Sequence, residues 1–109
     1  MREAYKIWHG YLVHFPKVSR YTLGVKVDSL FTDCLEYSLQ ARYASGEIKN
    51  IHINKLVVSF DSLKFFLQVL WDLKILDNSK YSYLSQHLAD IGKMIGGWQK
   101  YVKKETPPN

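Results

Sequence analysis

Apolar residues recur at alternating steps of three and four through three long segments of this chain, and this spacing restricts what it can fold into. The step places successive apolar side chains on one face of an α-helix. No segment alternates apolar and polar residues over a useful length, as a half-buried strand would. We therefore expect an all-α protein.

Four helical segments follow from the spacing and from the residues that interrupt it. Pro16 ends the first, because proline disfavours helical backbone at the residue before it. Gly46 is expected to cap the second at its C-terminus, and Asn78 or Ser79 to cap the start of the fourth. The expected helices cover, in order, about residues 3–15, 17–44, 50–76 and 80–103.

The residues expected to face the core share the three-four step along each helix. Short connections between long helices make neighbours antiparallel, so the prediction is an antiparallel up-down-up-down four-helix bundle. It forms one domain over residues 1–105, with 106–109 as a flexible C-terminal tail because Pro107 and Pro108 cannot continue a helix. The inward positions are Ile7, Trp8, Tyr11, Leu12, Phe15, Leu23, Val27, Leu30, Cys34, Tyr37, Ala41, Leu56, Phe60, Leu63, Leu67, Leu70, Leu84, Leu88, Ile91, Ile95, Trp98 and Val102.

Composition and charge narrow the class of protein. The chain has 109 residues and a single cysteine, Cys34, so no intramolecular disulfide can form. No leader sequence is recognisable and no apolar run approaches the ~20 residues that span a bilayer. We expect a cytoplasmic, bacterial protein that does not enter a membrane. Fifteen Lys and Arg against ten Asp and Glu give a formal charge of +5, which favours nucleic acid as a partner.

Local signals for catalysis or cofactor binding are missing from the sequence. The four histidines are scattered, and His9 and His14 are five residues apart, which does not place both on one helix face. No His or Cys has a partner at metal-ligand spacing, and no glycine-rich phosphate loop follows a strand. We expect no catalytic residues, no metal and no cofactor. The carboxylates Asp28, Asp33 and Glu36 are expected to be solvated or to pair with lysines of neighbouring helices.

Three short segments resemble a known family when they are taken together and in order. Residues 15–24 read FPKVSRYTLG, residues 61–64 read DSLK, and residues 91–98 read IGKMIGGW. They resemble the "FPKxxRYTLG" and "IGRMLGGW" signatures of accessory variability determinant (Avd) proteins. These are small four-helix proteins of diversity-generating retroelements, related to proteins encoded in 23S rRNA intervening sequences. Lys93 stands where many relatives place arginine. Gly92, Gly96 and Gly97 are read as permitting close helix–helix approach.

The resemblance implies an accessory protein that is not an enzyme. Such a protein would bind a reverse transcriptase and its template RNA through a basic oligomeric surface and support mutagenic retrohoming; DNA is a possible further ligand. Reversing the charge of Lys17 and Arg20 is expected to abolish RNA binding. For any single lysine the alternative is a solvated bundle face. The candidate phosphate contacts are Lys17, Arg20, Lys26, Arg42, Lys64, Lys74, Lys93 and Lys100.

Surplus apolar residues indicate self-association, because a bundle needs only one apolar stripe per helix. The resemblance implies a homopentameric ring; a homodimer or a wide core are the alternatives from the residues alone. The candidate interface residues are Trp8, Tyr11, Phe65, Phe66, Val69 and Trp71.

Two other functions remain open at this point. One is an intervening-sequence-type four-helix protein of unknown activity, and the other is a purely structural oligomerisation module. A reverse transcriptase reading frame in the neighbouring DNA would favour the retroelement function, and an rRNA insertion the first alternative. The oligomerisation module predicts no RNA binding at any salt concentration.

Overall fold

The structure is a computed structural model that describes residues 1–105, and all the regular secondary structure in that range is helical. Segments α2, η1 and α3 follow one another without a break, so they form one long helix that contains a π-helical turn. The predicted all-α four-helix arrangement is confirmed. The elements are α1 (Arg2–Leu12), α2 (Lys17–Ser19), η1 (Arg20–Gly24), α3 (Val25–Tyr43), α4 (Gly46–Asp72) and α5 (Asn78–Glu105). The tail predicted at 106–109 lies outside the described residues.

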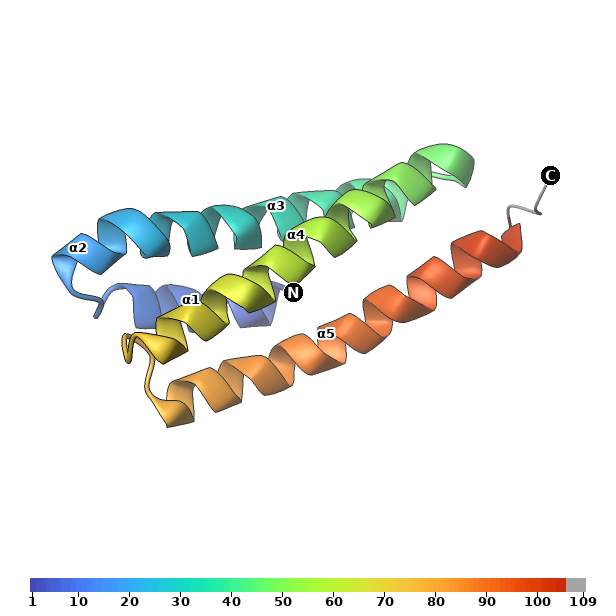
Figure 1. The fold of residues 1–109 in the computed structure, drawn as a ribbon. Helices are drawn as coiled ribbons and strands as arrows, with labels where there is room; N and C mark the ends of the chain where they lie inside the picture. Colours follow the sequence, from blue (N-terminus) through green and yellow to red (C-terminus); the bar gives the residue numbers. More distant parts are fainter. Residues whose placement is uncertain (106–109) are drawn as a thin grey trace.

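Helices α4 and α5 and the continuous helix α2–η1–α3 run the length of the molecule, whereas α1 covers only part of it (Figure 1). Successive long helices reverse direction at each turn, and α1 packs against α3 and α5. With 11 residues α1 is roughly 16 Å long, against about 40 Å for the 27 residues of α4. One half of the rod therefore has four helices, and the half that holds the α3–α4 turn and the end of α5 has three.

Helix α1 ends at Leu12, three residues earlier than predicted. The amides of His14 and Phe15 bond to the carbonyls of Tyr11 and Leu12, each three residues back, so the chain leaves the helix in a tight turn. Pro16 then stands as the N-cap of α2 with extended backbone. The early end follows from the bias of Pro16 against helical backbone at Phe15.

The α3–α4 turn differs from the prediction in the place of its glycine. Ala44 and Ser45 are extended, and Gly46, with φ +62°, is the first residue of α4. Gly46 therefore does not cap α3, and α4 begins four residues before Asn50. The positive φ explains the glycine, because other residues rarely adopt it.

Helix α4 stops at Asp72 in a Schellman turn, four residues before the predicted end at Leu76. The amide of Ile75 donates to the Leu70 carbonyl at 2.9 Å, and that of Lys74 to the Trp71 carbonyl at 2.9 Å. Lys74 has φ +62°, the left-handed conformation that this turn requires.

The residue that caps α5 is Asp77, in place of the predicted Asn78 or Ser79. Its Oδ1 accepts a hydrogen bond of 2.8 Å from the backbone amide of Lys80. The Asn78 Oδ1 instead accepts a 2.7 Å bond from Trp71 Nε1. Asp77 therefore fixes the start of α5, and Asn78 ties it to the end of α4.

The core follows the predicted inward stripes. Most of the predicted inward positions are buried, and Ile7, Tyr11, Leu12, Leu23, Tyr37 and Trp98 are partly buried against the core. A large cluster fills the four-helix half and the middle of the rod. A separate small cluster, made of Ala41, Ile53 and Val102, holds the three-helix end together. Among the described residues, no helix is long and apolar enough to cross a membrane.

Candidate nucleic-acid and subunit interfaces

The signature segment at residues 15–24 builds the corner between α1 and α3. Phe15 is buried, and its ring meets that of Trp8 edge-on at 5.4 Å between centroids. Arg20 Nη2 donates a 3.2 Å hydrogen bond to the Phe15 carbonyl. Gly24 is buried where a Cβ would lie 2.7 Å from Leu12 Cδ1. Pro16, Arg20 and Gly24 therefore each have a structural task in this corner.

Lys17 is the cation of this segment for which the structure gives no such task. It is exposed in the first turn of α2, whereas Arg20 is both exposed and bonded to the backbone. A charge reversal at Arg20 would remove a contact of the corner together with a positive charge. Effects of Lys17 on ligand binding are therefore easier to interpret than effects of Arg20.

Asp28 is the main correction among the acidic residues. It is half-buried, and its Oδ1 accepts hydrogen bonds from Tyr5 Oη at 2.9 Å and from Trp8 Nε1 at 3.2 Å. Burial, reinforced by the bond to Asp28, raises the pKa of Tyr5. Asp28 is therefore not simply solvated, and it joins α3 to two residues of α1.

The predicted phosphate-binding cations do not form one cluster. Lys17, Arg20, Lys26 and Lys74 belong to the end of the rod that holds the α1–α2 corner and the α4–α5 turn. Lys64 and Lys93 lie near its middle, and Arg42 and Lys100 belong to the opposite end, as their positions in α3, α4 and α5 show. All eight are exposed. The molecule extends 51 Å along its long axis, so one subunit offers these cations in separate groups.

Two of these cations are positioned by aromatic rings. Lys26 Nζ lies 5.6 Å from the centroid of the Phe66 ring, and Lys64 Nζ lies 5.0 Å from that of Phe60. Lys64 is also 3.5 Å from Asp61 Oδ1, in an exposed ion pair. Such exposed contacts contribute little to stability, but they hold the ammonium groups close to the surface of α4.

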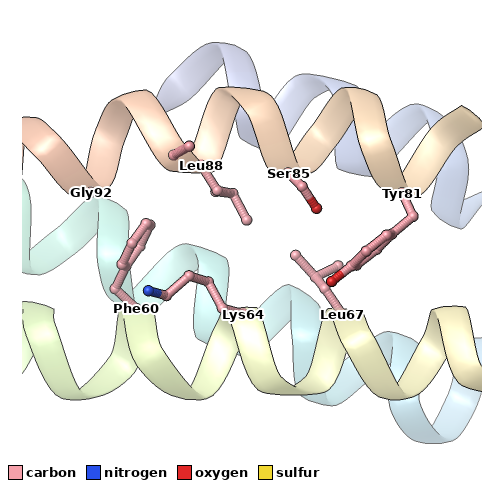
Figure 2. A pocket seen from close by; sticks show the side chains of 8 residues that line it. Phe60, Lys64, Leu67, Tyr81, Ser85, Leu88 and Gly92 are labelled. Atoms are coloured by element: carbon pink, nitrogen blue, oxygen red, sulfur yellow. The ribbon is translucent and has the colours of Figure 1, made fainter.

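A groove of about 330 Å³ runs between α4 and α5 (Figure 2). Phe60, Lys64 and Leu67 line it from α4, and Tyr81, Ser85, Leu88, Ala89 and Gly92 line it from α5. The lining set offers one cation and two hydroxyl groups but contains no carboxylate, imidazole or thiol.

The glycines of α5 do not serve close helix approach within the subunit, which corrects the prediction. A Cβ at Gly92 would meet Phe60 at 3.5 Å, an ordinary contact distance. Nothing lies within 4 Å of a Cβ built at Gly96 or Gly97. These two positions leave the α5 backbone accessible from outside the subunit.

Helix α4 carries a second apolar face, opposite the one that packs in the core. Ile51, Val58 and Phe65 are seven residues apart, two helical turns each, and all three are exposed. Val58 and Phe65 expose 67% and 59% of their surface. We call these three residues the outer stripe. An apolar row of this length on a surface helix is typical of a contact with another chain.

The six candidate interface residues differ in how far they are exposed. Phe65 and Trp71 are exposed, and Tyr11, Phe66 and Val69 are half-buried. Trp8 was assigned wrongly: it has no exposed surface and stacks on Phe31 at 5.9 Å between ring centroids. Trp71 stacks on Tyr81 at 4.6 Å. Trp8 lies on the buried face of α1, where its ring packs against those of Phe15 and Phe31.

Two further groups with shifted pKa values, the Cys34 thiol and the Tyr11 hydroxyl, belong to residues of the large core cluster or packed against it. Burial raises the pKa of the Cys34 thiol to about 12, and burial with the nearby charges of Tyr83 and Asp77 raises that of Tyr11. In the described part of the chain, no three His, Cys, Asp or Glu side chains gather into a group that would hold a metal. The shifted groups are distributed and do not form a common site.

Comparison with known protein families gives one clear assignment. The sequence profile of the bAvd-like family matches residues 2–102, which is almost the entire chain. The chain belongs to the bAvd-like family. Comparisons with curated proteins and with solved structures found no significant match. The family resemblance expected from the signatures at residues 15–24, 61–64 and 91–98 is thereby confirmed.

Sequence reasoning missed two cations of this bAvd-like chain, Lys49 and Lys55. Both lie on α4 near the α3–α4 turn, and Lys49 Nζ is 5.9 Å from the centroid of the Tyr101 ring of α5. The available signal was the scarcity of acidic residues around them, with Glu47 the only one in residues 37–57. This scarcity indicates a basic surface only once it is known that the C-terminal part of α5, with Lys100, packs beside the α3–α4 turn.

Proposed function

We propose that this bAvd-like protein is a non-enzymatic accessory protein of a diversity-generating retroelement. It binds template RNA and the reverse transcriptase as a homo-oligomer, a pentamer by resemblance, and supports mutagenic retrohoming. The observation that carries the proposal is the family match over residues 2–102. The charge of +5 and the exposed cations on every long helix support an electrostatic contact with phosphates.

The outer stripe supports the oligomer part of the proposal. It leaves three large apolar side chains exposed on a helix whose other face is buried. Gly96 and Gly97 leave part of the α5 backbone without a side chain above it. Contact with further copies of the chain would cover such surfaces.

The first test is a salt-titrated RNA-binding assay on the purified chain, with its mass measured by light scattering. We expect RNA affinity that falls steeply as salt rises from ~50 to ~200 mM, because phosphate contacts release counterions. We expect a mass of five times the 12.8 kDa of one chain. An assembly of that mass without RNA binding at low salt would instead indicate a structural oligomerisation module.

The second test concerns the polymerase. The reverse transcriptase encoded beside this chain should be retained on an affinity column that carries the assembled protein. Retention that survives nuclease treatment would show a direct protein contact. If no reverse transcriptase frame lies nearby, or if the polymerase is not retained, the retroelement part of the proposal is wrong.

A further inference from the structure

The charge of the described residues is concentrated at the three-helix end of the rod. We call residues 37–57 of α3 and α4, with 96–102 of α5, the basic tip. Its cations are Arg42, Lys49, Lys55 and Lys100, against one carboxylate, Glu47, so it carries +3. The other described side chains, in residues 1–36 and 58–95, hold nine cations and eight carboxylates, for a net charge of +1. About a quarter of the chain therefore carries most of its charge.

The basic tip also exposes aromatic side chains. Tyr43 is 80% exposed at the last residue of α3, the highest exposure among the large hydrophobic side chains. Tyr101 on α5 is exposed as well, and the ammonium group of Lys49 lies over its ring. Both ion pairs found among the described side chains, Lys6–Glu3 and Lys64–Asp61, lie outside the tip.

The interior of the tip is packed, and its outer surface is accessible to large ligands. Ala41, Ile53 and Val102, one from each of three helices, form the buried cluster that holds the end together. Helix α1 does not reach this end (Figure 1). A ligand can therefore approach the side chains of three helices without displacing an element of the fold.

We infer that the basic tip is a binding site for unpaired, single-stranded nucleic acid. Cations that outnumber carboxylates attract the phosphate backbone, and exposed tyrosines stack on bases that a duplex would keep inside. A duplex would also contact the cations, but its paired and stacked bases would not be available to stack on the tyrosine rings. The inference rests on the proposed nucleic-acid function and names the part of the surface and the form of the ligand.

The test compares two triple substitutions that remove the same charge. The tip variant is Arg42→Gln/Lys49→Gln/Lys100→Gln, and the control is Arg2→Gln/Lys6→Gln/Lys80→Gln. The control matches residue types, and Lys80 lies over the Tyr11 ring at 5.4 Å as Lys49 lies over Tyr101. Fluorescence anisotropy would measure affinity for a labelled single-stranded RNA, the same sequence as DNA, and its duplex.

We expect the tip variant to lose about tenfold or more in single-strand affinity at ~50 mM salt, and its salt slope to fall by about 2, or 0.7 for each of three lost contacts. The fold-loss of single-strand affinity in the control variant should be less than a third of the fold-loss in the tip variant. Equal losses in the two variants, or equal affinity of the wild type for duplex and single strand, would overturn the inference. Absence of any binding by the wild type would overturn the proposed function itself.

A second pair of variants isolates stacking from charge. Tyr43→Ala should weaken single-strand binding at least about fivefold, the factor that corresponds to the lower end of measured stacking energies. Tyr43→Phe should restore it, because the ring is retained. Tyr21→Ala, at an exposed tyrosine in η1, is the control. A loss in both alanine variants, or in neither, would contradict a stacking role for the tip.

Discussion

Gly24 is a position where the packing of the structure requires the residue type found in the sequence. It is buried in the π-helical segment η1, next to the end of α1. Besides the close approach to Leu12 Cδ1, an added Cβ would lie 3.2 Å from the Ser19 carbonyl oxygen. The Leu12 side chain can move aside, whereas the Ser19 oxygen belongs to the helix backbone. The glycine of the FPKVSRYTLG segment is therefore needed for close packing at the corner.

Gly24→Ala should lower the free energy of unfolding by roughly 1–3 kcal/mol, as overpacked positions do. Urea denaturation followed by circular dichroism would measure it. Gly10→Ala is the matched control in α1, because nothing lies within 4 Å of its Cβ. It should stabilise by about 0.5–1 kcal/mol through helix propensity. Equal effects at the two positions would show that the corner is not tightly packed.

At the scale of elements, the two-faced character of α4 has the clearest consequence. Its inner face supplies six buried residues to the core, and its outer stripe is exposed. Burial of the inner face explains why the helix is stable in one subunit. Stability of the subunit does not depend on the outer stripe, so substitutions there test association separately from folding.

The double substitution Val58→Asp/Phe65→Asp should dissociate the assembly into single chains of 12.8 kDa. Helical content should remain unchanged, because both side chains are exposed in the subunit. Asn50→Asp/Gln86→Asp, at exposed positions of α4 and α5 that lie off the stripe, adds the same charge and should leave the mass unaffected. Light scattering would decide, and an intact assembly in the Val58/Phe65 variant would exclude the stripe as the interface.

The helices and their inward faces were predictable from sequence, because one burial pattern repeats over many turns. Helix ends were less so, because they depend on one or two hydrogen bonds among neighbouring candidates, as with Asp77 beside Asn78 and Ser79. Contacts distant in sequence were not predictable. The carboxylate of Asp28 bonds to residues 20 and 23 positions earlier, and no local pattern marks that pairing.

At the scale of the molecule, the core is unequally distributed along the rod. The large buried cluster draws on α1, α3, α4 and α5, whereas the cluster at the basic tip has three buried members. Because α1 ends short of the tip, the backbone there has fewer buried side chains around it. Local opening should therefore begin at the tip, since regions with few buried apolar contacts open at lower free energy.

Hydrogen–deuterium exchange followed by mass spectrometry would measure this difference. Amides near Ala41, Ile53 and Val102 should exchange faster than those near Leu63 and Leu84 in the large cluster. Bound single-stranded RNA should slow exchange at the tip more than elsewhere. Uniform protection along α4 in the free protein would contradict the unequal core.

Because Cys34 is buried, its reaction with a thiol reagent can be used to detect local unfolding of the chain. It is the single cysteine, it has no exposed surface, and its pKa is raised to about 12, so at neutral pH the folded chain presents a protonated and inaccessible thiol. Only molecules that have opened at α3 expose a thiol of ordinary acidity to an alkylating reagent. The rate of alkylation of Cys34 therefore measures how often this part of α3 opens, and the measurement needs no introduced label.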